Sequence, residues 1–228
     1  MELAEVLAKL EAMGTEQNRK VYGRHGIGVN MFGVSFAEMK KLAKEIKKDQ
    51  RLTEQLWETG NWEARVVATM IADPKLIEEA QLHTWVECLT DHTLTDVLTS
   101  NLASKTPFAQ ALMVAWIRSE EEWVGRAGWQ MLTQLALGKE PLPDEFFEPF
   151  LEKIGTGIHQ SKNRIKEAMN TALIAIGSRN DLLEAKALQL AAAIGKVKVD
   201  HGETACKTPD ATAYINKMKQ RKLAKAKA

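Results

Sequence analysis

Apolar residues recur along most of the chain with the period of an α-helix. One set stands at positions i, i+3, i+4 and i+7 and shares one helix face: Met39, Leu42, Ala43 and Ile46. Residues 94–102 and 165–176 have closely similar spacing. No long stretch alternates between apolar and polar residues, and the β-branched residues are scattered instead of being clustered between turns. The pattern therefore predicts an all-α protein.

Short breaks rich in turn-forming residues separate the helical stretches. The first is the glycine-rich stretch 26–35, in which Ser35 can cap the helix that follows. Further breaks lie at residues 58–61, 72–75, 104–107, 137–145 and 176–181. They leave about a dozen helices of roughly 8 to 18 residues. Short helices with tight connections favour a right-handed α-solenoid of HEAT-like repeats, with a closed helical bundle as the alternative.

The C-terminal part differs from the rest. We expect residues 1–195 to form one HEAT-like repeat domain, and the turn-rich residues 196–216, with a last helix from about Pro209, to cap it. Residues 217–228 hold six basic residues and no acid, which leaves 25 basic and 30 acidic residues in the body, a net charge of about −5. We expect this basic tail to be disordered and solvated, or to make a loose contact with a polyanion.

Composition limits location and chemistry. Cys88 and Cys206 lie far apart in the sequence, which argues against a disulfide framework and favours a reducing compartment. The first residues do not resemble a signal peptide, and no apolar run approaches the roughly 18 residues of a membrane span. We therefore expect a cytoplasmic protein, associated with the nucleoid at most, without membrane contact. P-loop, GxGxxG, GxSxG and HExxH motifs are absent, so no cofactor and no metal site are predicted.

The stretch WVECLTDHTLTD, residues 85–96, concentrates groups that could do chemistry. Cys88, Asp91 and His92 could bind a metal, but a structural zinc site needs four ligands and no second pair is near. Helix capping explains the stretch better: Thr90 or Asp91 would cap the next helix, since a carboxylate there accepts a backbone N–H at the positive end of that helix. Asp96 falls opposite the apolar residues of that helix, so we expect it to face solvent or a groove.

Two basic groups are candidates for contacts with phosphates. Lys40, Lys44 and Lys47 share one helix face, opposite the apolar residues. The second group surrounds the start of a later helix and consists of Lys153, His159, Lys162, Arg164 and Lys166. Lysines on a helix usually form a solvated face, but two such groups on one concave surface would bind a nucleic-acid backbone.

The stretch EEWVGRAGW, residues 121–129, places Arg126 between Trp123 and Trp129. In one interpretation the tryptophans are core residues and the arginine reaches outward or pairs with a nearby glutamate. In the other interpretation Arg126 contacts a phosphate in a groove.

Four blocks of the sequence resemble the AlkD-like DNA alkylation repair proteins, a family built of HEAT-like repeats. The first, NRKVYGRHGIGVNMFGVSFAEMKKLAKEI, contains an apolar-Gly-apolar turn at Phe32-Gly33-Val34. The second, LWETGNWEARVVATMIAD, has Leu-Trp followed by a glutamate and an alanine-rich helix. The third, EEWVGRAGWQMLTQLA, contains Arg126, and the fourth, SKNRIKEAMNTALIAIG, contains the second basic group. The resemblance covers residues 12 to about 195.

The resemblance implies a C-shaped solenoid that holds duplex DNA in a basic concave groove, with Arg126 as a groove arginine. Active members of the family are monofunctional DNA N-glycosylases that excise cationic N-alkylated purines, such as 3-methyladenine and 7-methylguanine. They use no metal or cofactor and do not flip the base into a pocket, unlike most glycosylases. The purine is already a cationic leaving group, so a carboxylate and aromatic faces need only stabilise positive charge on the sugar.

The catalytic residues of the family are not reproduced in this sequence. The family pattern is a tryptophan followed four residues later by an aspartate, but the residue four after Trp85 is Leu89. Alignment through the next helix puts Asp91 and Thr95 at these two positions, and Thr171 at a second groove tryptophan. The candidate catalytic carboxylates are therefore Asp91 and its neighbour Asp96, and the candidate groove aromatics are Trp85 and Trp123.

Two main hypotheses follow. In the first, the chain is a monomeric DNA alkylation repair protein that binds duplex DNA and either excises cationic purines weakly or does not excise. In the second, it is a non-catalytic HEAT-like scaffold that binds DNA structures or protein partners, which the acidic body favours. Convergence of the basic groups on one surface would support the first. The remaining alternative is thiol or metal chemistry at Cys88, His92, His201 and Cys206.

Overall fold

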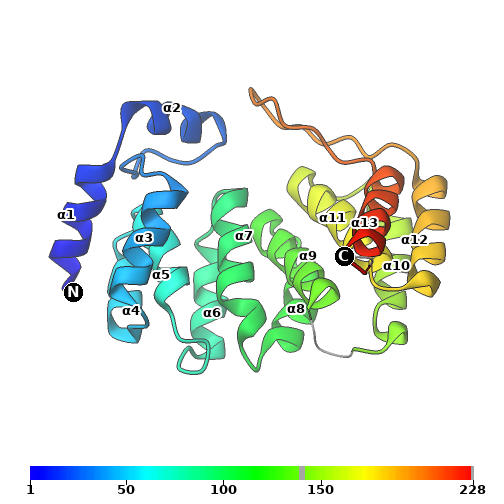
Figure 1. The fold of residues 1–228 in the computed structure, drawn as a ribbon, viewed down its shortest axis with the longest axis horizontal. Coiled ribbons are helices and arrows are strands. Elements are labelled where there is room, and N and C mark those ends of the chain that lie inside the picture. Colours follow the sequence, from blue (N-terminus) through cyan, green and yellow to red (C-terminus); the bar gives the residue numbers. More distant parts are fainter. Residues whose placement is uncertain (139–141, 227–228) are drawn as a thin grey trace. The chain divides into compact units, whose positions relative to one another are not determined.

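The computed structural model describes residues 1–138 and 142–226, and the regular structure within them is entirely helical (Figure 1). These residues form thirteen α-helices and two short 3-10 helices, and no strand occurs among them. The predicted all-α class is therefore confirmed for the described part of the chain. No helix in this part is long and apolar enough to cross a membrane.

Contacts within the chain define two compact units. Unit 1 consists of residues 1–112 and 201–205, and unit 2 of residues 113–200 and 206–228. The helices of unit 1 are α1 (Leu3–Met13), α2 (Glu16–Arg24), α3 (Phe36–Ile46), α4 (Gln50–Glu58), α5 (Trp62–Ile71), α6 (Glu79–Glu87), α7 (His92–Asn101) and the 3-10 helix η1 (Ala103–Lys105). Helix α8 (Ala109–Ile117) spans the boundary. Unit 2 contains α9 (Glu122–Leu137), the 3-10 helix η2 (Asp144–Phe146), α10 (Glu148–Gly157), α11 (Asn163–Gly177), α12 (Asp181–Ile194) and α13 (Ala211–Ala226).

Polar side chains start many of these helices, as the breaks in the sequence indicate. Seven of the described residues that stand immediately before a helix accept a hydrogen bond from the backbone N–H three positions later: Thr15, Ser35, Asp49, Asn61, Asp91, Asn180 and Asp210. Each satisfies one of the N–H groups that have no partner within the helix. The predicted caps at Ser35 and Asp91 are confirmed.

Glu63 fastens the connection between α2 and α3 to α5 in unit 1. Its fully buried carboxylate accepts hydrogen bonds from the backbone N–H groups of Phe32 (2.9 Å), Gly33 (2.6 Å) and Val34 (3.0 Å). Gly33 has a φ of +83°, and a Cβ there would lie 2.4 Å from the carbonyl oxygen of Thr15, so the turn requires glycine. The three donors offset the cost of burying the negative charge. The apolar-Gly-apolar turn thus holds α3 against α5, with which it packs.

Helix α11 is the centre of unit 2 and packs on α9, α10, α12 and α13. Glycines allow two of these close approaches. A Cβ at Gly125 on α9 would lie 2.6 Å from the Cδ1 atom of Ile165, and a Cβ at Gly177 would lie 2.7 Å from the Cβ atom of Ala187. Side chains larger than hydrogen at these positions would push the helices apart.

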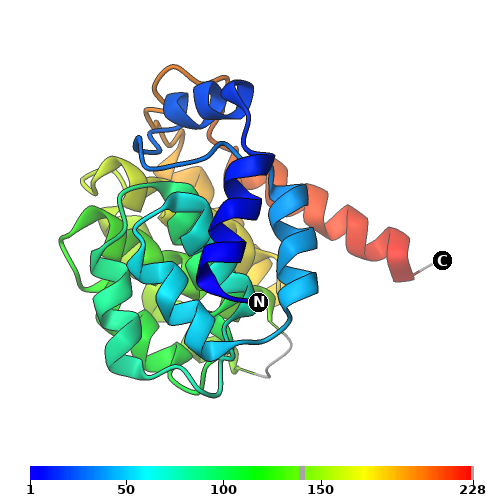
Figure 2. The same ribbon diagram turned by 90° about the vertical axis from the view of Figure 1, so that its left-hand side faces the viewer.

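The C-terminal segment ends in an ordered helix. Residues 195–210 have no regular structure, and α13 begins after Asp210, whose carboxylate accepts a hydrogen bond from the N–H of Ala213 (2.8 Å), close to the predicted start near Pro209. Residues 217–226 continue α13 (Figure 2), although the sequence analysis expected a disordered tail there. They are helical because α13 packs on α11 and α12. Residues 227–228 lie outside the described residues, and the predicted domain boundary at residue 195 stays a prediction.

Candidate nucleic-acid interface

Asp91, one of the two predicted catalytic carboxylates, is only 1% exposed. One carboxylate oxygen accepts a hydrogen bond from the backbone N–H of Leu94 (2.8 Å), and the other accepts one from the indole N–H of Trp62 (3.1 Å). Its backbone carbonyl accepts a hydrogen bond from the hydroxyl of Thr95 (2.7 Å), which is itself buried. Asp91 therefore starts α7 and joins it to α5, and it does not present a carboxylate at the surface.

Trp62 is the centre of an aromatic cluster that the sequence analysis did not identify. Its ring centroid lies 4.9 Å from that of Tyr22 and 5.9 Å from that of Phe36, whose ring meets it edge to face. Beside this cluster, the imidazoles of His25 and His92 lie 5.8 Å apart. Burial raises the pKa of the Tyr22 hydroxyl above its ordinary value, and the charge of a nearby glutamate raises it further. In the sequence, this cluster is indicated locally by Trp62, which directly follows the helix-capping Asn61.

The remaining candidate site residues, Trp85, Asp96 and Trp123, differ in how far they are exposed to solvent. Trp85, predicted as a groove aromatic, is 5% exposed and stacks on Trp57 with the ring centroids 4.2 Å apart and the planes 8° from parallel. This position corrects the prediction, because the ring is covered in the core of unit 1. Asp96 is half-buried on α7, and Trp123 is half-buried in the first turn of α9. Asp96 is therefore the more accessible of the two candidate carboxylates.

The predicted basic face of α3 is exposed. Lys40, Lys44 and Lys47 are exposed and form no ion pair within residues 1–138 and 142–226, while Met39 and Leu42 are buried on the other side of the helix. Their neighbour on the same helix, Lys41, donates to Glu38 instead. The three charges of Lys40, Lys44 and Lys47 are thus available to phosphates from solvent.

Arg126 and Arg164 of unit 2 belong to an ion-pair cluster in which Arg126 is buried and the other members are half-buried. The guanidinium of Arg126 is 3% exposed and donates to Glu167 Oε2 (2.7 Å) and to the carbonyl of Arg164 (3.2 Å). Arg164 donates to the same carboxylate oxygen (3.0 Å). Burial raises the pKa of Glu167, but the charge of Arg126 and the hydrogen bond and charge of Arg164 outweigh it, so the pKa lies below its ordinary value. Arg126 was predicted as a groove arginine, but its guanidinium is covered and its Nη1 atom donates within unit 2.

A cavity of about 350 Å³ lies beside the start of α11. Its floor includes the buried Trp129 and Met169, and its lining includes three exposed cations, Arg118, Lys153 and Lys162, against one acid, Glu120. None of the three cations forms an ion pair in the described part of the chain. The excess of positive charge in a concave site fits an anionic ligand such as a phosphate. The second basic group of the sequence already contained Lys153 and Lys162, whereas Arg118, which directly follows α8, was not predicted. Lys166, also predicted, is half-buried on α11.

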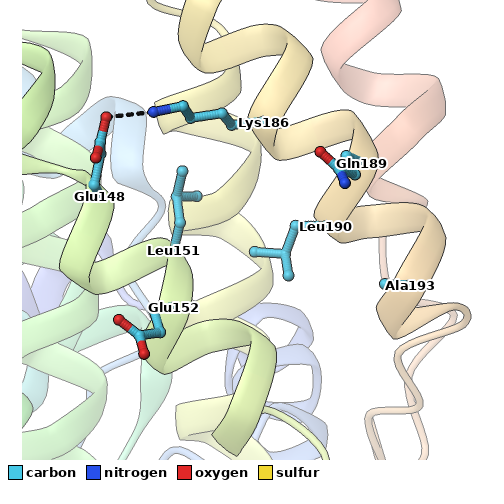
Figure 3. A pocket seen from close by; sticks show the side chains of 7 residues that line it. All are labelled: Glu148, Leu151, Glu152, Lys186, Gln189, Leu190 and Ala193. Carbon is cyan, nitrogen blue, oxygen red and sulfur yellow. Dashed lines mark hydrogen bonds and ion pairs between the residues drawn. The ribbon is translucent and has the colours of Figure 1, made fainter.

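A second cavity of unit 2, of about 310 Å³, lies between α10 and α12 (Figure 3). Leu151 and Leu190 provide its apolar walls, and Lys186 is paired with Glu148. The remaining charged side chain of the lining is Glu152. Because its one cation is already neutralised by a carboxylate, this cavity does not fit a phosphate.

Metal chemistry finds no support in the described residues. No group of three or more histidine, cysteine, aspartate or glutamate side chains among them could hold a metal ion. Cys88 and Cys206 are both exposed and are not joined in a disulfide.

Comparison with known proteins adds the family. The family model for a DNA alkylation repair enzyme matches residues 6–215. The chain belongs to this family. A solved structure described as "a new family of proteins related to the HEAT-like repeat DNA glycosylases with affinity for branched DNA structures" superposes with a TM-score of 0.89 and 32% sequence identity, covering 97% of this chain and 95% of the other. This likeness confirms the predicted HEAT-like repeat fold.

Two bacterial relatives have the same length of match. The uncharacterized proteins Lin0241 of Listeria innocua and Lmo0209 of Listeria monocytogenes are each 28% identical over 219 residues, which is 93% of this chain and 95% of theirs. The family resemblance thus extends over nearly the whole chain, and beyond the four blocks from which it was first inferred.

Proposed function

We propose that this protein binds DNA, prefers branched DNA to an unbranched duplex, and does not use Asp91 to excise bases. The observation that carries the proposal is the likeness, over nearly the whole chain, to a protein described as having affinity for branched DNA structures. Membership of the DNA alkylation repair family supports DNA as the partner. A monomer that binds DNA in this way needs no cofactor.

The exposed cations of each unit suit this role. Lys40 and Lys44 offer two unpaired charges on one face of α3, and Lys47, the residue directly after the helix, offers a third. In unit 2, Arg118 and Lys162 line a cavity that can receive a phosphate. Phosphate contacts of this kind carry no sequence information, so binding would depend on DNA structure and on salt more than on sequence.

Base excision has less support in this chain than DNA binding has. Stabilising a cationic transition state requires a carboxylate that reaches the sugar. Asp91 is buried and already accepts two hydrogen bonds, and Thr95, at the family's aspartate position, is also buried. Weak excision of 3-methyladenine or 7-methylguanine is the second candidate function, and Asp96 would serve it, because it is half-buried on the same helix.

Binding is tested with a four-way junction and a duplex of matched sequence, each at two salt concentrations. We expect tighter, salt-sensitive binding of the junction. In the variant Lys40→Gln/Lys44→Gln, the slope of log K against log salt should fall by about 2, since each phosphate contact contributes roughly 0.9. The control is Lys41→Gln, on the same helix but paired with Glu38, which should change the slope less. Equal affinity for junction and duplex would remove the branched preference, and no binding at low salt would overturn the proposal.

Excision is tested by measuring release of methylated purines from alkylated DNA. We expect no release by the wild type beyond the spontaneous rate. If release occurs, Asp96→Asn and Asp91→Asn distinguish the two carboxylates. Release that is lost only in Asp96→Asn would establish the second candidate function, and release lost only in Asp91→Asn would contradict the structural role of Asp91.

A further inference from the structure

Helix α13 has one side that is committed to packing in unit 2. Ala211 and Ile215 are buried, and a Cβ at Gly177 on α11 would lie 2.8 Å from the Cδ1 atom of Ile215. On the same side Lys222 donates to the carbonyl oxygen of Ser178 at the end of α11. The helix is thus fixed against α11 and α12, and its two sides are distinct.

A second set of lysine contacts strengthens this docking. Lys219 forms ion pairs with Glu184 (2.8 Å) and Asp181 (3.6 Å) at the start of α12. These carboxylates and the hydrogen bond to Glu184 raise the pKa of Lys219, so it stays charged throughout the physiological range. Lys219 and Lys222 are therefore engaged within the protein, and they do not belong to the outer side of the helix.

The neighbouring face of the helix carries a stripe with no such partners. Tyr214, Lys217 and Arg221 are three and four residues apart, share one helix face and are exposed; we call them the α13 stripe. The Nζ atom of Lys217 lies 5.5 Å from the centroid of the Tyr214 ring. Neither Lys217 nor Arg221 forms an ion pair in the described part of the chain. A fixed helix thus presents two free cations beside an exposed aromatic ring.

The charge distribution of the chain favours a polyanion at this stripe. Residues 217–228 hold six of the 31 basic residues, and the remainder of the chain has 25 basic residues against 30 acidic ones. An approaching polyanion is therefore attracted to α13 and repelled by much of the remaining surface. Lys217 and Arg221 are about 6 Å apart along the axis of α13, comparable to a rise of two base pairs, about 3.4 Å each, along the axis of duplex DNA.

We propose that the α13 stripe is a second nucleic-acid contact surface, which binds the phosphate backbone of one arm of a branched DNA. Tyr214 would lie against a sugar or an unpaired base near the branch point, where stacking is available. A branched molecule offers arms in several directions, so contacts with one arm at the stripe and with another arm elsewhere on the protein add their free energies. An unbranched duplex offers a single direction. This inference rests on the proposed function and supplies a physical reason for the preference.

The test compares Lys217→Gln/Arg221→Gln with the wild type on a four-way junction and a matched duplex. The control is Lys75→Glu, an exposed residue between α5 and α6 in unit 1, because it changes the net charge by the same two units. For the double variant we expect about a tenfold loss of junction affinity, a change of less than about threefold for the duplex, and a salt slope on the junction lower by about 2. The conservative exchange Lys217→Arg/Arg221→Lys should retain the wild-type preference, and circular dichroism checks that α13 stays helical.

The outcomes separate this inference from the proposed function. A wild type that does not bind the junction would overturn both. A wild type that prefers the junction, together with a double variant that keeps the full preference, would overturn the α13 stripe alone. An equal loss on junction and duplex, or the same loss in Lys75→Glu, would also overturn it, because the effect would then be one of net charge.

Discussion

Asp91 in unit 1 and Glu167 in unit 2 are both carboxylates held inside the protein, but their donors differ. Asp91 accepts hydrogen bonds from neutral groups, the backbone N–H of Leu94 and the indole of Trp62. Glu167 accepts from two guanidinium groups, those of Arg126 and Arg164. In unit 1 the N-terminus of α7 thus helps to stabilise the negative charge, whereas in unit 2 two guanidinium groups bind the carboxylate directly.

The difference shows why residue type alone assigns roles poorly in this chain. Asp91 and Arg126 were both candidates for contact with DNA, and both are nearly fully buried. The cations that do reach solvent unpaired, such as Lys40 and Lys217, stand on outer helix faces. Whether a charged side chain can bind a ligand therefore depends on whether the fold already pairs it with another residue of the protein.

The largest effect is expected from breaking the cluster of unit 2. Arg126→Gln leaves the half-buried carboxylate of Glu167 without its most buried cation, so the free energy of unfolding should fall by roughly 3 kcal/mol. Arg164→Gln should cost less, because the Arg164 side chain is 17% exposed and Arg126 is 3% exposed. Urea denaturation measures both. If Arg126→Gln kept its stability and lost affinity for DNA, Arg126 would be a phosphate contact after all.

A smaller effect is expected at the start of α7. Asp91→Ala removes the cap, at about 1 kcal/mol, and leaves the indole N–H of Trp62 without its acceptor, so about 2 kcal/mol in total is expected. Asp91→Asn keeps an oxygen for the cap but turns an amide donor toward the indole, and should cost about 1 kcal/mol. Thermal unfolding of the two variants measures the difference. Equal stability of Asp91→Ala and the wild type would show that the indole bond and the cap contribute nothing.

The sequence predicts local features well and long-range partners poorly. The amphipathic face of α3 and the caps at Ser35 and Asp91 follow from spacings of a few residues, and all are present. The partner of Asp91 is 29 residues away, and that of Arg126 is 41 residues away, so no local pattern reveals them. Likewise, the high charge of residues 217–228 predicts a disordered tail, whereas residues 217–226 belong to α13. This helix is held by contacts with α11 and α12, which no local pattern reveals.

The smallest effect expected from the comparison is in the pH dependence of unit 2. The pKa of Glu167 is lower in the folded protein than its ordinary value of 4.5, because the two arginines outweigh the effect of burial. A depressed pKa means that the unfolded chain binds the proton more tightly, so this stabilisation is fully present above about pH 4.5 and is lost as the pH falls through the folded pKa. Urea unfolding between pH 6 and pH 3 should therefore show a steeper loss of stability in the wild type than in Glu167→Gln, which has no proton to gain at this position. Identical slopes for the two proteins would mean that Arg126 and Arg164 do not favour the charged form of Glu167. The difference between the donors of Glu167 and those of Asp91 would then have no effect on stability.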